Sequence, residues 1–286
     1  MKQRLVKGLR LVRQNKVSVL LFILGGLILL FPIVSQVSYY IASHQTINRF
    51  EKRAAKLDNR VLDKRIALAK AYNDTLSRSP LIIDPFTQRQ KAGIREYARM
   101  LEVNEQIGHV ALPHIGVDIP VYAGTSEAVL ARGSGHLEGT SLPVGGRSTH
   151  AVLTAHRGLP TARLFTDLNK VKKGDTFYVT NIKETLAYKV DSIKVVKPTE
   201  LEAVKIVEGK DYVTLLTCTP YMINSHRLLV RGERVPYPAK KAKSLEAAAK
   251  RQHVYQLILI GILILLLVVL LGLLLKHYMR VRRKGV

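Results

Sequence analysis

The chain contains a single cysteine, Cys218, and the sequence around it favours chemistry over packing. One cysteine excludes a framework of disulfides within the chain. The run from Asp211 to Cys218 is typical of a strand that ends at the cysteine, because a break at Thr219-Pro220 follows. A small, inert core residue is the alternative interpretation. A thiol at a strand end beside a loop is accessible, so we expect Cys218 to be a nucleophile.

Two basic side chains are candidates to assist this thiol. The next strand opens at His226-Arg227, and pairing of the two strands would bring Arg227 within reach of Cys218. Arginine keeps its proton, so it is a poor base but a permanent ligand for an oxyanion or a carbonyl. His156 closes the apolar run AVLTAH at another strand end, where it could exchange a proton with the thiol.

The other histidines are weaker candidates. His136 lies in a glycine-rich segment, RGSGHLEGT, and is the main competitor of His156 for the catalytic role. The alternative interpretation of His156 is a surface histidine whose hydrogen bonds are satisfied and which has no catalytic role. His150 shares a strand face with His156, but six residues separate them by about 20 Å, so only one can serve Cys218. Five others are expected to be structural or to flank a membrane: His44, His109, His114, His253 and His277. No metal-ligand cluster is visible, and we predict no metal and no cofactor.

Two apolar segments predict transmembrane helices. Residues 17–41 carry no charge, and residues 255–275 contain the uninterrupted run LILIGILILLLVVLLGLLL. A soluble helix of this length would normally show a polar face. A cleaved signal peptide is the alternative for the first segment, but its apolar run exceeds the about 7–15 residues of such a peptide.

The distribution of charge predicts the orientation of these helices. The chain has 45 Lys and Arg against 21 Asp and Glu, a net charge of +24. Both terminal tails, residues 1–16 and 276–286, are basic, so the positive-inside rule places both termini in the cytoplasm and the intervening domain outside the cell. The lipid bilayer is thus one partner. Nucleic acid is not expected, since no zinc-finger spacing or RNA-binding motif appears.

The outer portion divides into four segments. Residues 76–92 hold two prolines and read as an exposed loop, residues 93–238 are rich in short β-branched runs, and residues 239–254 form a basic spacer. The strand spacing predicts a mainly β domain, an antiparallel barrel rather than a doubly wound sheet. Residues 45–75 predict one helix with an apolar stripe at spacings of three and four: Ile47, Phe50, Ala54, Leu57, Val61 and Ala67–Leu68.

The run Thr214-Leu215-Leu216-Thr217-Cys218 resembles the Thr-Leu-x-Thr-Cys signature of sortases, with histidine on an earlier strand and arginine in the next. The likeness covers about residues 45–235. The second span and the triplet Asp84-Pro85-Phe86 resemble class C, the pilus-assembling sortases, in which a loop with Asp-Pro-aromatic forms a lid over the active site. The resemblance implies a closed eight-stranded β-barrel, preceded by a helical and lid segment and flanked by two transmembrane helices.

The same resemblance implies a reaction. A class C sortase cuts a Leu-Pro-x-Thr-Gly-like sorting signal after the threonine and passes the acyl group to an amine, a pilin lysine. By this likeness Cys218 is the nucleophile, His156 the general acid and base, Arg227 the oxyanion ligand and Thr217 a substrate contact. Three alternatives stay open: a sortase that anchors proteins to the cell wall, an anchored cysteine protease that passes the product to water, and a scaffold without catalysis.

Overall fold

A computed structural model of the 286-residue chain describes residues 16–76, 96–103 and 105–238, together with Gly261, Ile262, Val268 and Gly272. The chain divides into two compact units. One comprises Met1–Val37 and Arg251–Val286, and the other comprises Ser38–Lys250. Two predicted segments, the lid loop and the basic spacer, lie almost entirely outside the described residues, and so does the second transmembrane helix at 255–275.

The helix α2, Lys16–Ala54, contains the first predicted span. Among the described residues it is the one helix that is long and apolar enough to cross a membrane. It continues past the expected end of the span at residue 41 and into the segment predicted as a separate helix from residue 45. The apolar residues Ile47, Phe50 and Ala54 are buried, as the sequence pattern predicts.

The predicted helix over 45–75 is wrong in one respect, because the structure divides it. The helix α2 ends at Ala54, and α3 spans Asn59–Thr75. Asp58 starts the new helix, since its carboxylate accepts a hydrogen bond from the backbone N–H of Arg60 at 2.8 Å. The interruption shifts the buried stripe, so the expected Val61 and Leu68 are exposed. The buried apolar residues of α3 are instead Leu62, Ile66 and Ala69.

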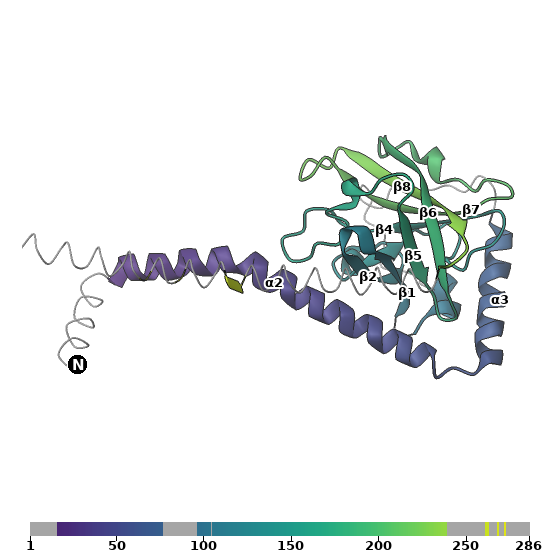
Figure 1. The fold of residues 1–286 in the computed structure, drawn as a ribbon, viewed down its shortest axis with the longest axis horizontal. Coiled ribbons are helices and arrows are strands. Elements are labelled where there is room, and N and C mark those ends of the chain that lie inside the picture. The colour runs from purple at the N-terminus through teal and green to yellow at the C-terminus, as the bar shows by residue number, and fades with distance from the viewer. Residues whose placement is uncertain are drawn as a thin grey trace, which may run out of the picture. The chain divides into compact units, whose positions relative to one another are not determined.

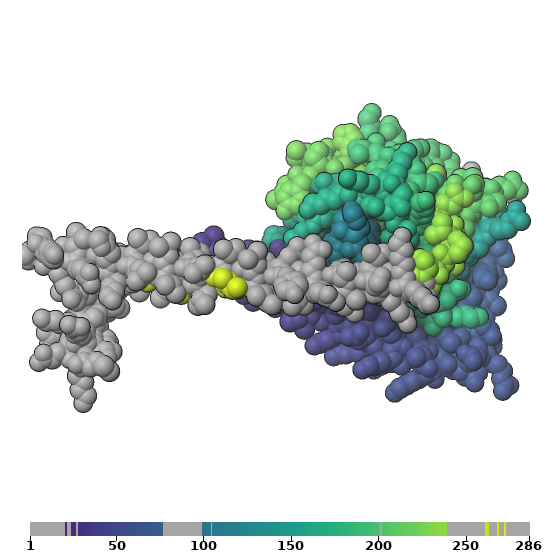
Figure 2. Space-filling model, viewed as in Figure 1, coloured from purple at the N-terminus to yellow at the C-terminus, as the bar shows by residue number. Residues whose placement is uncertain are grey.

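Eight strands form a closed barrel, as expected, in the order β1-β2-β3-β4-β7-β8-β6-β5 (Figure 1). Their bounds are Gln106–Leu112 for β1, Val117–Ala123 for β2, Ser134–His136 for β3, Thr149–Thr154 for β4, Thr176–Thr180 for β5, Thr185–Val196 for β6, Asp211–Thr219 for β7 and His226–Val235 for β8. Short helices lie between them: η1 at Glu96–Leu101, η2 at Pro113–Ile115, α4 at Glu127–Leu130, η3 at Leu168–Lys170 and η4 at Leu201–Val204. In the space-filling view, the blue residues of α3 lie against the barrel (Figure 2).

The expectation of an antiparallel barrel is wrong, because the sheet is mixed. The pairs β2 with β3 and β4 with β7 are parallel, and the other pairs are antiparallel. Parallel pairing requires a long connection. The segment containing α4 supplies it before β3, and the hairpin of β5 and β6 intervenes between β4 and β7. Within the glycine-rich segment that contains His136, Ser134–His136 form the short strand β3.

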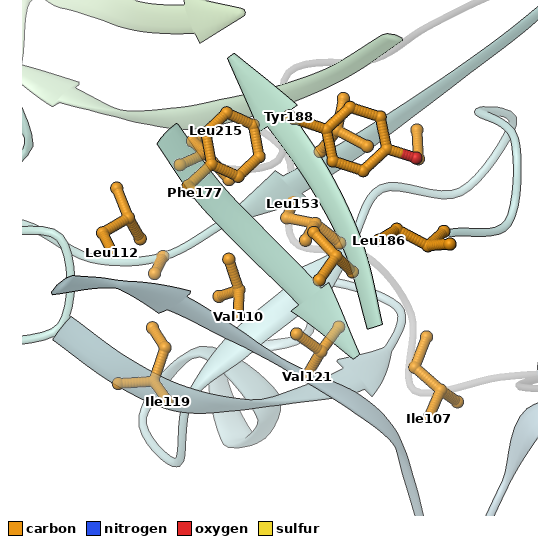
Figure 3. Close-up of a cluster of buried hydrophobic side chains, with 14 of the residues drawn as sticks. Ile107, Val110, Leu112, Ile119, Val121, Leu153, Phe177, Leu186, Tyr188 and Leu215 are labelled. Atoms are coloured by element: carbon orange, nitrogen blue, oxygen red, sulfur yellow. The ribbon is translucent and has the colours of Figure 1, made fainter. Parts of the chain in front are cut away.

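Alternating residues of β7 pack into two different clusters, and this alternation positions the cysteine. Leu215 belongs to the barrel core, where it lies with Val110, Phe177 and Tyr188 (Figure 3). Leu216 packs instead on the opposite face of the sheet, in a cluster of Leu137, Val152, Val204, Leu216 and Leu229. Because side chains of a strand alternate between faces, Cys218 lies on the same outer face as Leu216.

Candidate active site

Cys218 and Arg227 occupy directly paired positions at the ends of β7 and β8. Paired residues of two antiparallel strands project from the same face of the sheet. Both side chains are largely buried, with 5% of Cys218 and 2% of Arg227 exposed, so the expectation that the thiol is accessible is wrong. The structure therefore sets a thiol and a permanent positive charge side by side in a site with little access to water.

The parallel pair of β4 and β7 brings His156 to the other side of Cys218. The ladder pairs Thr154 with Leu216, and the backbone N–H of Ala155 donates to the carbonyl of Leu216 at 3.2 Å. The paired residues end at Thr154 and Leu216, so His156 and Cys218 each lie two residues past the last pair of these neighbouring strands. Cys218 thus lies near the end of the middle strand of three, with Arg227 at the start of β8 on one side and His156 just past the end of β4 on the other.

Two hydrogen bonds hold the backbone at His156. The Thr217 hydroxyl donates to the carbonyl of Ala155 at 2.7 Å, and the N–H of Phe165 donates to the carbonyl of His156 at 3.1 Å. Thr217, expected to contact substrate, is fully buried in this structure. Its hydroxyl connects the residue before Cys218 to the residue before His156.

The guanidinium of Arg227 is oriented by its own loop. Its Nη1 donates to the carbonyl of Asn224 at 2.9 Å and to the carbonyl of His226 at 3.1 Å. The same loop exposes three consecutive apolar side chains, Tyr221, Met222 and Ile223. These carbonyls fix the position of the cation, and the exposed side chains extend apolar surface from the strand ends that carry Cys218 and Arg227.

Two residues near the site were missed by sequence reasoning. Arg157 donates from Nη1 to the hydroxyl of Thr219 at 2.9 Å, and Glu127 places Oε1 3.4 Å from Nε2 of His156. Glu127 is highly exposed, so its ion pair with a protonated His156 contributes little to stability. The position of Arg157 directly after His156 was the available signal in the sequence. The approach of Glu127 depends on folding and has no such signal.

The competing histidines are held elsewhere in a neutral form. His136 pairs with Leu153 on β4, and its Nε2 donates to the carbonyl of Ser141 at 2.7 Å. Burial lowers the pKa of His136 to about 4. Burial likewise lowers the pKa of His150 to about 4, and His150 is bonded to the carbonyl of Lys205 and to the hydroxyl of Thr214. Of the candidates considered, only His156 follows a strand end beside Cys218.

This arrangement suits acyl transfer. A thiolate attacks a carbonyl carbon, the fixed guanidinium stabilises the oxyanion that forms, and an imidazolium protonates a departing amine. Within the described part of the chain, no group of three or more His, Cys, Asp or Glu side chains is placed to hold a metal ion.

Comparisons with known proteins give the same picture. Residues 110–235 match the sortase domain family. The chain is 31% identical to sortase A of Bacillus anthracis over 141 residues, which cover 49% of this chain and 65% of that relative. The chain thus spans slightly less than two thirds of that curated relative.

Solved structures extend the likeness. The sortase C2 of pilus island 1 from group B Streptococcus is 79% identical, has a TM-score of 0.61, and is matched over 63% of this chain and 100% of its own. Sortase C-1 from Streptococcus pneumoniae is 61% identical with a TM-score of 0.65, over 68% of this chain and 99% of its own. At such identity along the whole length of solved relatives, the chain belongs to the sortase family.

Proposed function

We propose that the protein is a membrane-anchored cysteine transpeptidase of class C, which joins pilus subunits. The observation that supports the proposal is the pairing of Cys218 with Arg227 on β8, together with the parallel pairing of β4 with β7, which brings His156 to the same end of the strands. The class follows from likeness to solved sortases C, one of which comes from a pilus island. The substrate is then a pilin with a Leu-Pro-x-Thr-Gly-like signal, and the acceptor is a pilin lysine.

The reaction proceeds in two acyl transfers. The Cys218 thiolate attacks the carbonyl carbon of the signal's threonine, and Arg227 stabilises the resulting oxyanion. His156 as imidazolium gives its proton to the departing glycine nitrogen, so the C–N bond breaks and a thioester remains. A lysine amine then attacks the thioester and loses a proton to the neutral His156. The C–S bond breaks as the new amide forms, and the Cys218 thiolate and the His156 imidazolium are restored.

Anchoring follows from the apolar helix. The single long apolar helix among the described residues, α2, supports attachment of the chain to a membrane. The finer topology, with a second span at 255–275, both termini in the cytoplasm and the catalytic domain outside, is proposed from the sequence alone. A domain outside the cell would meet pilin substrates as they emerge from the membrane.

The lid also remains a proposal from the sequence. Asp84, Pro85 and Phe86 lie outside the described residues. If the segment 76–92 covers Cys218, replacing Asp84 and Phe86 together by alanine will speed labelling of Cys218 by a neutral thiol reagent. Equal labelling rates in the variant and the wild type would remove the lid from the proposal.

The deciding experiment uses the full chain purified in detergent, incubated with a sorting-signal peptide and, in separate reactions, a lysine-containing acceptor peptide or a cell-wall peptide with a free amine. Mass spectrometry is expected to find an amide between threonine and the lysine side chain. Cys218→Ala should abolish both this product and the thioester. A free threonine carboxylate alone would indicate a protease, unchanged peptide would indicate a scaffold, and transfer only to a cell-wall amine would indicate an anchoring sortase.

A further inference from the structure

A side-chain hydrogen bond links the residue after His156 to the residue after Cys218. Nη1 of Arg157 donates to the Thr219 hydroxyl at 2.9 Å. The two residues are far apart in the sequence, and neither belongs to the Cys-His-Arg group that performs the acyl transfer proposed above. The bond therefore joins the two chain segments that carry the nucleophile and the proton donor.

The location of this bond gives it a consequence for the site. Paired residues of β4 and β7 end at Thr154 and Leu216, so His156 and Cys218 lie beyond the parallel ladder. Up to this point the two segments are joined through Ala155, by the N–H that donates to Leu216 and by the carbonyl that accepts from Thr217. Beyond Ala155, the hydrogen bond between Arg157 and Thr219 joins the two segments again, one residue after His156 and one residue after Cys218.

The side chain of Arg157 is itself fixed by several contacts. Its Nε donates to the carbonyl of Thr166 at 3.1 Å, and its guanidinium carbon lies 6.0 Å from the centre of the Tyr221 ring. The N–H of Gly158 donates to the Thr166 hydroxyl at 3.3 Å, which fixes the same turn. A planar guanidinium with donors at set angles meets two acceptors in one geometry, which the single ammonium of lysine does not reproduce.

We propose that Arg157 and Thr219 form a brace that sets the spacing between the His156 imidazole and the Cys218 thiol. Arg157 is a positioning residue, which acts through His156 and touches no substrate. The proposal rests on the transpeptidase function proposed above. Proton transfer and thiol attack both depend steeply on geometry, and a displacement of about 1 Å costs on the order of 100-fold in rate.

The first test measures steady-state transpeptidation by the full chain in detergent. Arg157→Gln and Thr219→Val are each expected to lower kcat by about 10- to 100-fold while KM stays unchanged. Thr219→Ser keeps the hydroxyl and should restore kcat to near the wild-type value. Arg163→Gln is the matched control, since Arg163 lies in the same loop but pairs with the nearby Asp167. A change confined to KM, or an unchanged kcat, would overturn the brace.

The second test asks whether the two side chains act as a unit. The double variant Arg157→Gln with Thr219→Val should be no slower than the slower single variant, because either change alone breaks the same bond. Losses that multiply in the double variant would mean that the two residues act separately, and the brace would be wrong. Circular dichroism and thermal unfolding establish that each variant is folded. If Arg157→Gln does not fold, the kcat of Thr219→Val alone decides the proposal, because this variant removes the same hydrogen bond.

A third measurement separates this proposal from the proposed function. Iodoacetamide labelling of Cys218 at fixed pH needs no substrate, and a nearby imidazolium favours the reactive thiolate. Arg157→Gln should move the labelling rate from the wild-type value toward that of His156→Gln, whereas Arg163→Gln should not. If the wild type forms no amide product, the proposed function fails, and labelling still decides the brace. An Arg157→Gln rate equal to the wild-type rate would overturn it.

Discussion

Cys218 and Arg227 are direct partners in the antiparallel ladder of β7 and β8. The guanidinium of Arg227 is already oriented before any substrate arrives, because the carbonyls of Asn224 and His226 accept hydrogen bonds from it. A fixed positive charge needs no reorganisation when an oxyanion forms, and this preorganisation is the largest contribution in many acyl transfers. The position of Arg227 therefore fits stabilisation of the oxyanion in the transition state better than binding of the uncharged substrate carbonyl.

The first prediction concerns Arg227. Arg227→Ala should lower kcat by about 10²- to 10³-fold, the usual cost of a lost oxyanion donor, with a smaller change in KM. Arg227→Lys keeps the charge but loses the planar fork, so its kcat should lie between those of alanine and wild type. Steady-state kinetics of peptide transfer measure both. Arg234→Lys, at the other end of β8, is the control, and a larger loss there would contradict the assignment.

The second prediction separates the two histidines that the sequence left in competition. His156→Gln should lower kcat by about 10²-fold or more, since the leaving amine loses its proton donor. His136→Ala should instead lower the free energy of unfolding by about 1–3 kcal/mol, because the buried carbonyl of Ser141 loses its donor. Kinetics and chemical denaturation of both variants measure the two effects. A selective loss of kcat in His136→Ala would reverse the assignment.

The third prediction concerns the attachment of α3 to the barrel. The amide of Asn73 forms two hydrogen bonds with Leu142: its Nδ2 donates to the carbonyl at 3.1 Å, and its Oδ1 accepts from the N–H at 2.7 Å. Asn73→Leu leaves both buried backbone groups unpaired and should cost about 2–4 kcal/mol of unfolding free energy. Denaturation followed by circular dichroism measures it. The exposed neighbour gives the control Asp74→Asn, and equal stability of both variants would contradict the prediction.

The sequence predicted those features that depend on local patterns. The apolar runs marked α2, and the β-branched runs marked most strands. The predicted strand ends at His156 and Cys218 differ slightly from the structure, in which β4 ends at Thr154 and β7 ends at Thr219. The end of a strand is visible in the sequence because the residues that break the strand directly follow it, as Arg157-Gly158 follow His156 and Thr219-Pro220 follow Cys218. Cys218, His156 and Arg227 could therefore be chosen before their mutual positions were known.

The remaining features depend on contacts between distant segments. The parallel pair of β4 and β7 joins residues about sixty positions apart, so no local pattern distinguishes it from an antiparallel pair. The strand β3 has three residues, too few for an alternating pattern. The capping of α3 by Asp58 shifted the buried stripe of the helix, and the bond between Arg157 and Thr219 is visible only after folding.

The last prediction rests on His109, which connects α2 to the first two strands of the barrel. Its Nδ1 lies 2.9 Å from Oδ1 of Asp118 on β2, and its Nε2 lies 3.3 Å from Oε1 of Glu51 on α2. His44, also on α2, lies 3.9 Å from Asp118. Burial alone lowers the pKa of His109, but the hydrogen bonds and charges of Asp118 and Glu51 outweigh it and raise the pKa to about 9.

A pKa of about 9 in the folded chain, above the reference of about 6.5 for an unfolded histidine, makes stability depend on pH. The protonated side chain contributes its full stabilisation below about pH 6.5, and this contribution is lost as the pH rises through about 9. The gap in unfolding free energy between wild type and His109→Gln should therefore be largest at pH 6 and shrink toward pH 9.5. Chemical denaturation of the full chain in detergent at each pH measures it. The exposed His114 supplies the control His114→Gln, for which the gap should stay small throughout. A gap for His109→Gln that is constant or grows with pH would mean that the protonated imidazole does not hold α2 to the barrel.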